Sequence, residues 1–233
     1  MESKLLPLND TNWLVSVLGE KALLLKPKLD EIPLSVIHES VRIIEAASIP
    51  VVVDIIPAYD SIAIVYSRLL GNLDEEIEII SKAVEEKTVE TYSSQTCEIP
   101  VCYELGLDWR EVEEKTGFEK EEVIQKHLSV SYKVAMMGFI PGFLYLSGLK
   151  EEIACPRKAE PRTSIPAGSV GIGGNQTGVY SLESPGGWQI IGRTPLSFFD
   201  VRKDPPIKVR AGDTIVFKRI PEVQFTNFKK EEV

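Results

Sequence analysis

Residues 136–149 read MMGFIPGFLYLSGL, an apolar run that glycine and proline interrupt repeatedly. Glycine weakens strands and helices alike, and proline removes a hydrogen-bond donor from a sheet. The stretch therefore indicates either a sharp bend through the interior or a ligand or partner that approaches the backbone closely. It also opens a glycine-rich region, because eleven of the 16 glycines lie between Gly138 and Gly192. With no helical period, this region predicts the short strands and tight turns of an all-β barrel or closed sandwich.

The N-terminal part of the chain has a different pattern, in which short strands alternate with helices. The order strand, strand, helix, strand, strand, helix is typical of a small α+β domain with its helices on one face of a sheet. The polar stretch TYSSQTCEIP at 91–100 then marks a boundary, so we expect domains at 1–92 and 93–233. The expected N-terminal elements are strands at 13–19 and 21–28, a helix after Ser35, a hairpin at 51–67 and a helix capped by Asp74.

Two short helices are predicted between Asp108 and His127. Asp108 and Glu111 have the spacing of a capping box, and Gly117 ends the first helix. A helix pair across a glycine is also found in helix-turn-helix DNA-binding motifs, but acidic residues outnumber basic ones here and the whole chain carries a net charge of −9. Phosphate would be repelled, so we expect no nucleic-acid partner. His127 is expected to be a structural histidine rather than a proton shuttle.

The composition is that of a soluble globular protein, with 43% hydrophobic and 26% charged residues. No run approaches the roughly 20 apolar residues that cross a bilayer. The N-terminus also lacks the apolar segment of a secretory signal, so we expect a cytoplasmic protein without a membrane partner. Cys97, Cys102 and Cys155 are an odd set without zinc-site spacing, which predicts reduced thiols and no metal site. Residues 229–233 are expected to form a frayed tail.

Several residues of the glycine-rich region are candidates for binding an anion. The segment GIGGNQTG at 171–178 offers backbone amides, but its spacing is not that of a nucleotide-binding fold, and a barrel corner that needs positive φ is the stronger alternative. A guanidinium binds two oxygens of a carboxylate or phosphate, although each arginine could equally form a surface ion pair. The candidate catalytic residues are Arg157, Arg162 and Arg193. The candidate substrate- and nucleotide-binding residues are Gly171, Gly173, Gly174, Asn175, Gln176, Gly186 and Gly187.

Aromatic residues around the opening stretch are candidates for a cleft or a partner interface. Strand alternation places Trp188 and Ile190 on one face of a strand, and Ile191 and Arg193 on the other. The alternative is a tight internal corner that the aromatic side chains fill. The candidates are Phe139, Pro141, Gly142, Phe143, Tyr145 and Trp188.

Read together, the segments at 132–149 and 156–195 and the late motifs FFD and AGD resemble the family of 5-oxoprolinase B subunits, also called the KipI or allophanate hydrolase subunit 1 family. The resemblance implies a cyclophilin-like β-barrel with short flanking helices behind the small α+β domain. The chain departs from the family pattern at Leu144, where proline is usual, and at Gly173, where alanine is usual.

The resemblance also implies a function and partners. The family hydrolyses 5-oxoproline to glutamate with ATP as co-substrate, with Mg²⁺ as a possible companion of the ATP and with no tightly bound cofactor. The B subunit is expected to be inactive alone and to act with two partners, a C subunit, which has a second cyclophilin-like barrel, and an A subunit. The arginines and amides named above are what this chain offers to a transferred phosphoryl group. The alternatives are a KipI-like inhibitor of a sensor histidine kinase and a carboxyltransferase-type component of a urea carboxylase.

Overall fold

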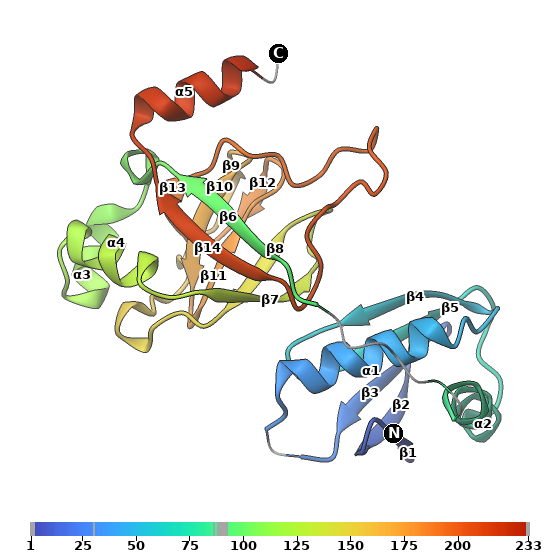
Figure 1. The fold of residues 1–233 in the computed structure, drawn as a ribbon. Coiled ribbons are helices and arrows are strands. Elements are labelled where there is room, and N and C mark those ends of the chain that lie inside the picture. The colour runs from blue at the N-terminus through green and yellow to red at the C-terminus, as the bar shows by residue number, and fades with distance from the viewer. Residues whose placement is uncertain (1–2, 30, 86, 88–92, 232–233) are drawn as a thin grey trace. The chain divides into compact units, whose positions relative to one another are not determined.

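The computed structural model describes residues 3–29, 31–85, 87 and 93–231. The chain divides into two compact units, Met1–Ser93 and Ser94–Val233 (Figure 1). Each unit has its own hydrophobic core and is described by itself.

The first unit is a five-stranded antiparallel sheet with two helices packed on one face (Figure 1). Alternate strand residues such as Trp13, Leu23 and Ile64 are fully buried together with Ile37 and Ile80 from the two helices. Both helices therefore cover the same face. The strand order is β1-β2-β3-β5-β4. The elements are β1 (Lys4–Leu8), β2 (Thr11–Leu18), β3 (Ala22–Pro27), α1 (Leu34–Ala46), β4 (Val52–Pro57), β5 (Ile62–Tyr66) and α2 (Leu73–Val84).

The ends of the two helices differ from the sequence expectation. Pro33 is the N-cap residue of α1, so the helix begins before Ser35. Asn72 rather than Asp74 caps α2, because the Asn72 side chain accepts a hydrogen bond from the backbone N–H of Asp74 at 2.9 Å. An acidic residue in the first turn is favourable without being the cap, since it lies near the positive end of the helix dipole.

The second unit is built on a seven-stranded sheet with the order β13-β10-β11-β8-β7-β14-β6 (Figure 1). Its edge strands meet where Cys102 and Arg193 exchange both backbone hydrogen bonds, at 2.8 and 3.0 Å. The sheet is thus a nearly closed barrel, and the predicted all-β barrel is confirmed at this level. A short two-stranded sheet, β12-β9, accompanies it. The strands are β6 (Thr96–Val101), β7 (Tyr132–Met137), β8 (Leu144–Ser147), β9 (Arg162–Ile165), β10 (Ser169–Gly173), β11 (Gln176–Val179), β12 (Ser184–Gly186), β13 (Gln189–Arg193) and β14 (Thr214–Arg219).

In the second unit, two helices lie between β6 and β7 in the sequence and a third follows β14. They are α3 (Trp109–Thr116), α4 (Lys120–Leu128) and α5 (Glu222–Glu231). Gly117 ends α3 at a φ of 74°, as predicted. The predicted tail at 229–233 is wrong as far as Glu231, because α5 continues to that residue; residues 232–233 lie outside the described residues.

Candidate functional site

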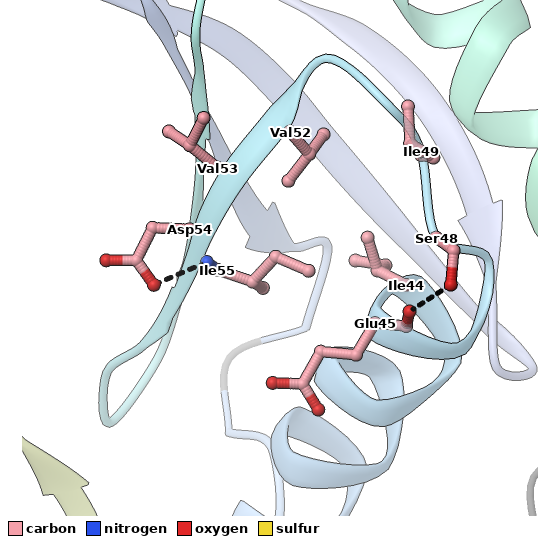
Figure 2. Close-up of a pocket in the computed structure, with 8 residues that line it drawn as sticks. All are labelled: Ile44, Glu45, Ser48, Ile49, Val52, Val53, Asp54 and Ile55. Carbon is pink, nitrogen blue, oxygen red and sulfur yellow. Dashed lines mark hydrogen bonds between the residues drawn. The ribbon is translucent and has the colours of Figure 1, made fainter. Parts of the chain in front are cut away.

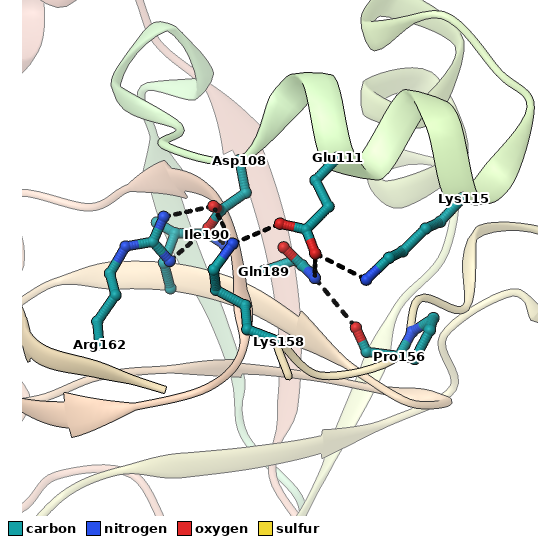
Figure 3. A network of polar contacts seen from close by, with 8 residues as sticks. All are labelled: Asp108, Glu111, Lys115, Pro156, Lys158, Arg162, Gln189 and Ile190. Carbon is teal, nitrogen blue, oxygen red and sulfur yellow. Dashed lines mark hydrogen bonds and ion pairs between the residues drawn. The ribbon is translucent and has the colours of Figure 1, made fainter. Parts of the chain in front are cut away.

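A polar network joins the start of α3 to β9 and β13 (Figure 3). Asp108, the N-cap residue of α3, is 5% exposed. Its carboxylate accepts hydrogen bonds from both terminal nitrogens of Arg162, with Nη1 at 2.9 Å, and from the backbone N–H of Ile190 at 2.7 Å. Lys158 Nζ adds a further bond at 3.2 Å. A buried carboxylate with this many donors is compensated, so Asp108 anchors the segment around Arg162 to the barrel.

Glu111, on the first turn of α3, supplies the second carboxylate of the network. It accepts hydrogen bonds from Lys115 Nζ at 2.7 Å, from Gln189 Nε2 at 2.9 Å and from Lys158 Nζ. These hydrogen bonds, first that of Lys115, lower the pKa of Glu111 to about 2. The hydrogen bond to Glu111 in turn raises the pKa of Lys158. Lys158 therefore bridges the two carboxylates as a cation.

Gln189 lies at the centre of the network and has no exposed surface. Its Nε2 also donates to the backbone carbonyl of Pro156 at 3.1 Å. Its Oε1 is buried and accepts no hydrogen bond from any residue that the structure describes. An orphaned buried acceptor costs about 1–3 kcal/mol, and a buried water is the usual way to satisfy one.

Of the candidate site residues predicted from the sequence, Arg162 belongs to this network; Lys158 was predicted beside it as part of an anion-binding edge or a solvated loop. Sequence reasoning assigned Asp108 and Glu111 to a capping box, which is wrong, because Asp108 makes no side-chain cap hydrogen bond and both carboxylates bind the cations instead. The capping box belongs to the next helix, where Glu119 and Glu122 form it. The network carries a net charge of +1, since three cations face two carboxylates, in a chain of net charge −9.

Arg157 lies apart from this network, on a cluster of aromatic residues. Its guanidinium carbon is 5.7 Å from the centre of the Trp188 ring, a distance suited to a cation–π interaction. Trp188 is 4% exposed and Phe143 is 1% exposed, and their rings pack edge-to-face with ring centres 5.5 Å apart. The ring centres of Phe143 and Tyr145 are 4.5 Å apart. Arg157 itself is exposed, so the cluster forms a rigid base beneath a surface cation.

Arg193 lies at the seam where the barrel closes. Its Nε donates to the carbonyl oxygen of Ala167 at 2.8 Å, and its guanidinium carbon is 5.9 Å from the centre of the Phe225 ring. Burial lowers its pKa. The candidate arginines therefore have separate partners: a carboxylate for Arg162, an aromatic ring for Arg157, and a carbonyl group with an aromatic ring for Arg193.

The glycine-rich candidate segment forms the hairpin between β10 and β11. Gly171 pairs with Gly178 and Gly173 pairs with Gln176, which leaves residues 174 and 175 as a two-residue loop. Gly174 has a φ of 68°, as the first loop position of a type II′ turn requires. The positive-φ turn foreseen as the alternative is therefore present, and anion binding by this segment stays a prediction.

Other glycines of the candidate set make room for aromatic side chains. A Cβ added at Gly173 would lie 2.6 Å from the ring of Trp188, and one at Gly186 would lie 2.5 Å from the hydroxyl of Tyr180. At Gly187 a Cβ would meet nothing nearer than 3.6 Å. Close packing thus explains Gly173 and Gly186 without a ligand, and Gly187 is left without a packing reason.

His127 is buried in the barrel interior with both ring nitrogens hydrogen-bonded. Thr177 Oγ1 donates to the carbonyl of Gly171 at 3.0 Å, so it accepts from His127 Nε2, also at 3.0 Å. His127 Nδ1 then accepts from the Tyr103 hydroxyl at 2.8 Å. Burial lowers the pKa of His127 to about 3. The neutral ring, stacked on Phe217 at 4.7 Å, is a structural histidine.

A separate pocket lies in the first unit, between the end of α1 and strand β4 (Figure 2). Its lining is mainly aliphatic, and the hydrogen bonds drawn in it are local: Asp54 accepts from the N–H of Ile55, and Ser48 donates to the carbonyl of Glu45. No predicted site residue lines it, and we assign no ligand to it. The lining residues are Ile44, Glu45, Ser48, Ile49, Val52, Val53, Asp54 and Ile55.

Within residues 3–29, 31–85, 87 and 93–231, no three or more His, Cys, Asp or Glu side chains are grouped so as to hold a metal ion. No helix in the same ranges has the length and apolar character needed to cross a membrane.

Comparison with known proteins defines the family to which this chain belongs. A family model described as the carboxyltransferase domain, subdomain C and D, matches residues 13–209. The chain is 39% identical over 232 residues to the 5-oxoprolinase B subunit of Bacillus subtilis (strain 168), covering 93% of this chain and 97% of that protein. It is 44% identical over 170 residues to the 5-oxoprolinase B subunit of Escherichia coli O157:H7, covering 72% and 78%. The chain thus belongs to the carboxyltransferase subdomain C and D family and, within it, to the group of 5-oxoprolinase B subunits.

Solved structures share the fold of this chain. The crystal structure of TTHA0988 matches with a TM-score of 0.74 and 29% identity over 86% of this chain, which spans only 40% of that protein. A conserved uncharacterized protein from Pyrococcus horikoshii matches with a TM-score of 0.55 and 39% identity, covering 91% of this chain and 99% of that one. The urea amidolyase of K. lactis has a TM-score of 0.75 at 16% identity, over 98% of this chain and 16% of that one, and shows a shared fold alone.

Proposed function

We propose that this chain is the B subunit of an ATP-dependent 5-oxoprolinase, which opens the lactam ring of 5-oxoproline to give glutamate. The observation that carries the proposal is the 39% identity to the B. subtilis protein, which extends over 97% of that protein's length. The second unit would be a cyclophilin-like barrel, and the working protein a cytoplasmic complex with a C subunit, which carries a second such barrel, and an A subunit. The chain would be inactive alone.

ATP is needed because an unactivated lactam resists attack by water. Transfer of the γ-phosphoryl group to the carbonyl oxygen releases ADP and makes the ring carbon electrophilic. One water adds to that carbon and the ring nitrogen leaves as the amine, which gives an acyl phosphate. A second water releases inorganic phosphate and leaves the glutamate side-chain carboxylate. Preorganised cations and amides stabilise the charge that develops on the transferred group.

The network around Arg162 supports a share of this task for the present chain. It places the Arg162 guanidinium and the Lys158 ammonium on the same Asp108 carboxylate, and with Lys115 its three cations exceed its two carboxylates by one charge. Asp108 accepts one hydrogen bond from each terminal nitrogen of Arg162 and so fixes the orientation of the guanidinium. We infer that the remaining N–H donors of Arg162 would bind a ligand. Arg193 and the amides of 171–178 remain candidates of the same kind.

The test is reconstitution from purified proteins. The A, B and C subunits of the same organism are mixed, and 5-oxoproline-dependent ADP and glutamate formation are measured. We expect turnover only when all three are present. Turnover with this chain alone, or none with all three, contradicts the proposal. Replacing 5-oxoproline by urea tests the carboxylase alternative, and autophosphorylation of a sensor kinase from the same cell tests the inhibitor alternative.

Variants then test the residues within the active complex. Arg162→Ala and Arg193→Ala are expected to lower kcat at a temperature where circular dichroism shows both variants folded. Unchanged turnover in both would remove them from the catalytic candidates. The matched control is Arg202→Ala, because Arg202 is an exposed arginine of the same unit whose ion pair with Asp200 is local.

A further inference from the structure

Lys158 is bound to Glu111, a carboxylate that has other donors as well (Figure 3). Glu111 also accepts hydrogen bonds from Lys115 Nζ at 2.7 Å and from Gln189 Nε2 at 2.9 Å. Among the causes that lower the pKa of Glu111, the hydrogen bond from Lys115 is the largest and that from Lys158 follows it. The Glu111 side chain is 31% exposed, so water reaches it too. Glu111 would therefore remain a compensated carboxylate if Lys158 turned away.

The hydrogen bond of Lys158 to Asp108 is likewise one of several. Asp108 accepts two hydrogen bonds from Arg162 and one from the backbone N–H of Ile190 at 2.7 Å. The bond from Lys158, at 3.2 Å, is the longest of those to this carboxylate. Removing the sole partner of a buried carboxylate is strongly destabilising, but here the donors of Arg162 and Ile190 would remain.

The charges of the network also single out Lys158. Lys115 and Arg162 balance the two carboxylates, Glu111 and Asp108, and Lys158 adds a third cation. The network would thus be neutral without Lys158. Its positive charge is available to an anion from outside the chain.

Gln189 gives Glu111 a neutral donor that stays in place whatever Lys158 does. Gln189 has no exposed surface, and its Nε2 bonds to Glu111 and to the carbonyl of Pro156 fix the orientation of the amide. In this orientation its Oε1 is buried and has no donor among the residues that the structure describes. An unsatisfied buried acceptor is destabilising, yet the orientation that creates it supplies Glu111 with a buried donor.

Lys158 and Arg162 meet at one oxygen atom, because Lys158 Nζ and Arg162 Nη2 both donate to Asp108 Oδ1. An ammonium has three N–H donors and a guanidinium has five, and in the described part of the chain each cation uses two of them. The side chains of Lys158 and Arg162 are 19% and 26% exposed, whereas that of Asp108 is 3% exposed. The unused donors of both cations can therefore reach one ligand from the solvent side.

We propose that Lys158 is a transferable cation, which leaves Glu111 and binds one oxygen of a phosphoryl group while Arg162 binds another. This inference rests on the proposed function and adds a catalytic residue to it. A phosphoryl dianion suits two neighbouring cations, because it carries two charges and its oxygens accept charge-assisted hydrogen bonds in several directions. The group is either the γ-phosphoryl group of ATP or the acyl phosphate that follows ring opening. Lys158 keeps its proton throughout, and its role is to stabilise charge.

The kinetic test uses the A, B and C subunits reconstituted as one complex, with kcat and the KM for ATP measured for each variant of this chain. Lys158→Met keeps the side-chain stem and removes the charge, and we expect kcat to fall at least about 100-fold. Lys158→Arg keeps the charge and should have a kcat at least about tenfold above that of Lys158→Met. The control is Lys218→Met, because Lys218 is an exposed lysine of the same unit that pairs with Glu98, and its kcat should not change.

Thermal unfolding of the full-length chain separates a transferable cation from a structural one. We expect Lys158→Met to melt within about 2 °C of the wild type, because both carboxylates keep their other donors. Arg162→Met should melt far lower, since Arg162 supplies two of the hydrogen bonds to the buried carboxylate. An equal fall in the two variants overturns the inference, because Lys158 would then be a structural residue.

The kinetic outcomes also identify the source of the phosphoryl group. A lower kcat of Lys158→Met with an unchanged KM for ATP supports contact after the group has been transferred, and a raised KM for ATP beside the lower kcat supports contact with bound ATP. Wild-type kcat in Lys158→Met, or an equal loss in Lys158→Met and Lys158→Arg, overturns the inference and leaves the proposed function intact. A wild-type complex without turnover overturns the proposed function itself.

Discussion

Asp108 and Arg162, which are 54 residues apart in the chain, form a bidentate ion pair that ties the start of α3 to the start of β9. The Asp108 side chain is 3% exposed and the Arg162 side chain 26% exposed. Because the carboxylate is buried, its charge depends on its partners for compensation. The same pair fixes the orientation of a guanidinium that we propose for phosphoryl-group binding, so stability and function are joined at one contact.

Removing the cation of this pair should destabilise the chain strongly. We expect Arg162→Met to lower the free energy of unfolding by about 3 kcal/mol, since it leaves a buried carboxylate with fewer donors. The double variant Asp108→Asn/Arg162→Met should recover part of that loss, and urea denaturation measures all three. The control is Lys218→Met, which breaks an exposed pair with Glu98 and should cost less than about 1 kcal/mol. A similar small loss for Arg162→Met would contradict the compensating role.

Gly173 should tolerate no side chain while Trp188 keeps its place. Gly173→Ala sets a methyl group 2.6 Å from the indole, and we expect a loss of about 1–3 kcal/mol in unfolding free energy, with a shift in tryptophan fluorescence. Gly187→Ala is the matched control. Its new Cβ has room and its φ is not positive, so it should be neutral or stabilising by about 0.5 kcal/mol. Equal stability of the two variants would show that Trp188 is free to move.

How far the sequence predicts this fold depends on how local each signal is. The hairpin β10–β11 and the end of α3 were predictable, because glycine at positive φ acts within a few residues. Strand β1 was missed, since Pro7 breaks a strand pattern and is tolerated here only because β1 is an edge strand. Helix α5 was missed because its exposed, polar sequence has little periodicity.

The candidate site was less predictable than the fold for a physical reason. The pairing of Asp108 with Arg162 and of Glu111 with Lys158 is set by the tertiary packing of α3 against β13, which no local pattern encodes. The spacing of Asp108 and Glu111 also fits a capping box, which is what the local sequence predicts. The face alternation of β13 was predictable, because Ile190 packs in the aromatic cluster and Ile191 in the barrel core.

Glu111 should contribute a stability that acid removes. Its pKa is lowered in the folded chain to about 2, whereas an unfolded glutamate titrates near about 4.3. The carboxylate of Glu111 is therefore protonated at a lower pH in the folded chain than in the unfolded chain. Its contribution to the free energy of unfolding is fully present above about pH 4.3 and is lost as the pH falls toward 2. We expect the stability difference between the wild type and Glu111→Gln to be constant above about pH 5 and to shrink below about pH 4.3. Glu114→Gln, on an exposed position of the same helix, is the control, and a gap that stays constant in acid would contradict the prediction.

His127 should make the barrel sensitive to pH in a different window. Its pKa in the folded chain is about 3, whereas an unfolded histidine titrates near about 6.5, so only the unfolded chain gains a proton between these values. Stability should then fall by about 1.4 kcal/mol for each pH unit below about 6.5, in addition to the carboxylate contributions.

The variant His127→Gln has no imidazole, so this pH-dependent loss of stability is absent from it. We expect the variant to be less stable at neutral pH, because the hydrogen bonds to Tyr103 and Thr177 are disturbed, and the gap to narrow as the pH falls to about 5. Urea denaturation at several pH values measures the gap, and nitrogen chemical shifts of the imidazole report its protonation directly. An imidazole that titrates near about pH 6.5 in the folded chain, or a gap that does not change with pH, would show that His127 is not held neutral by burial.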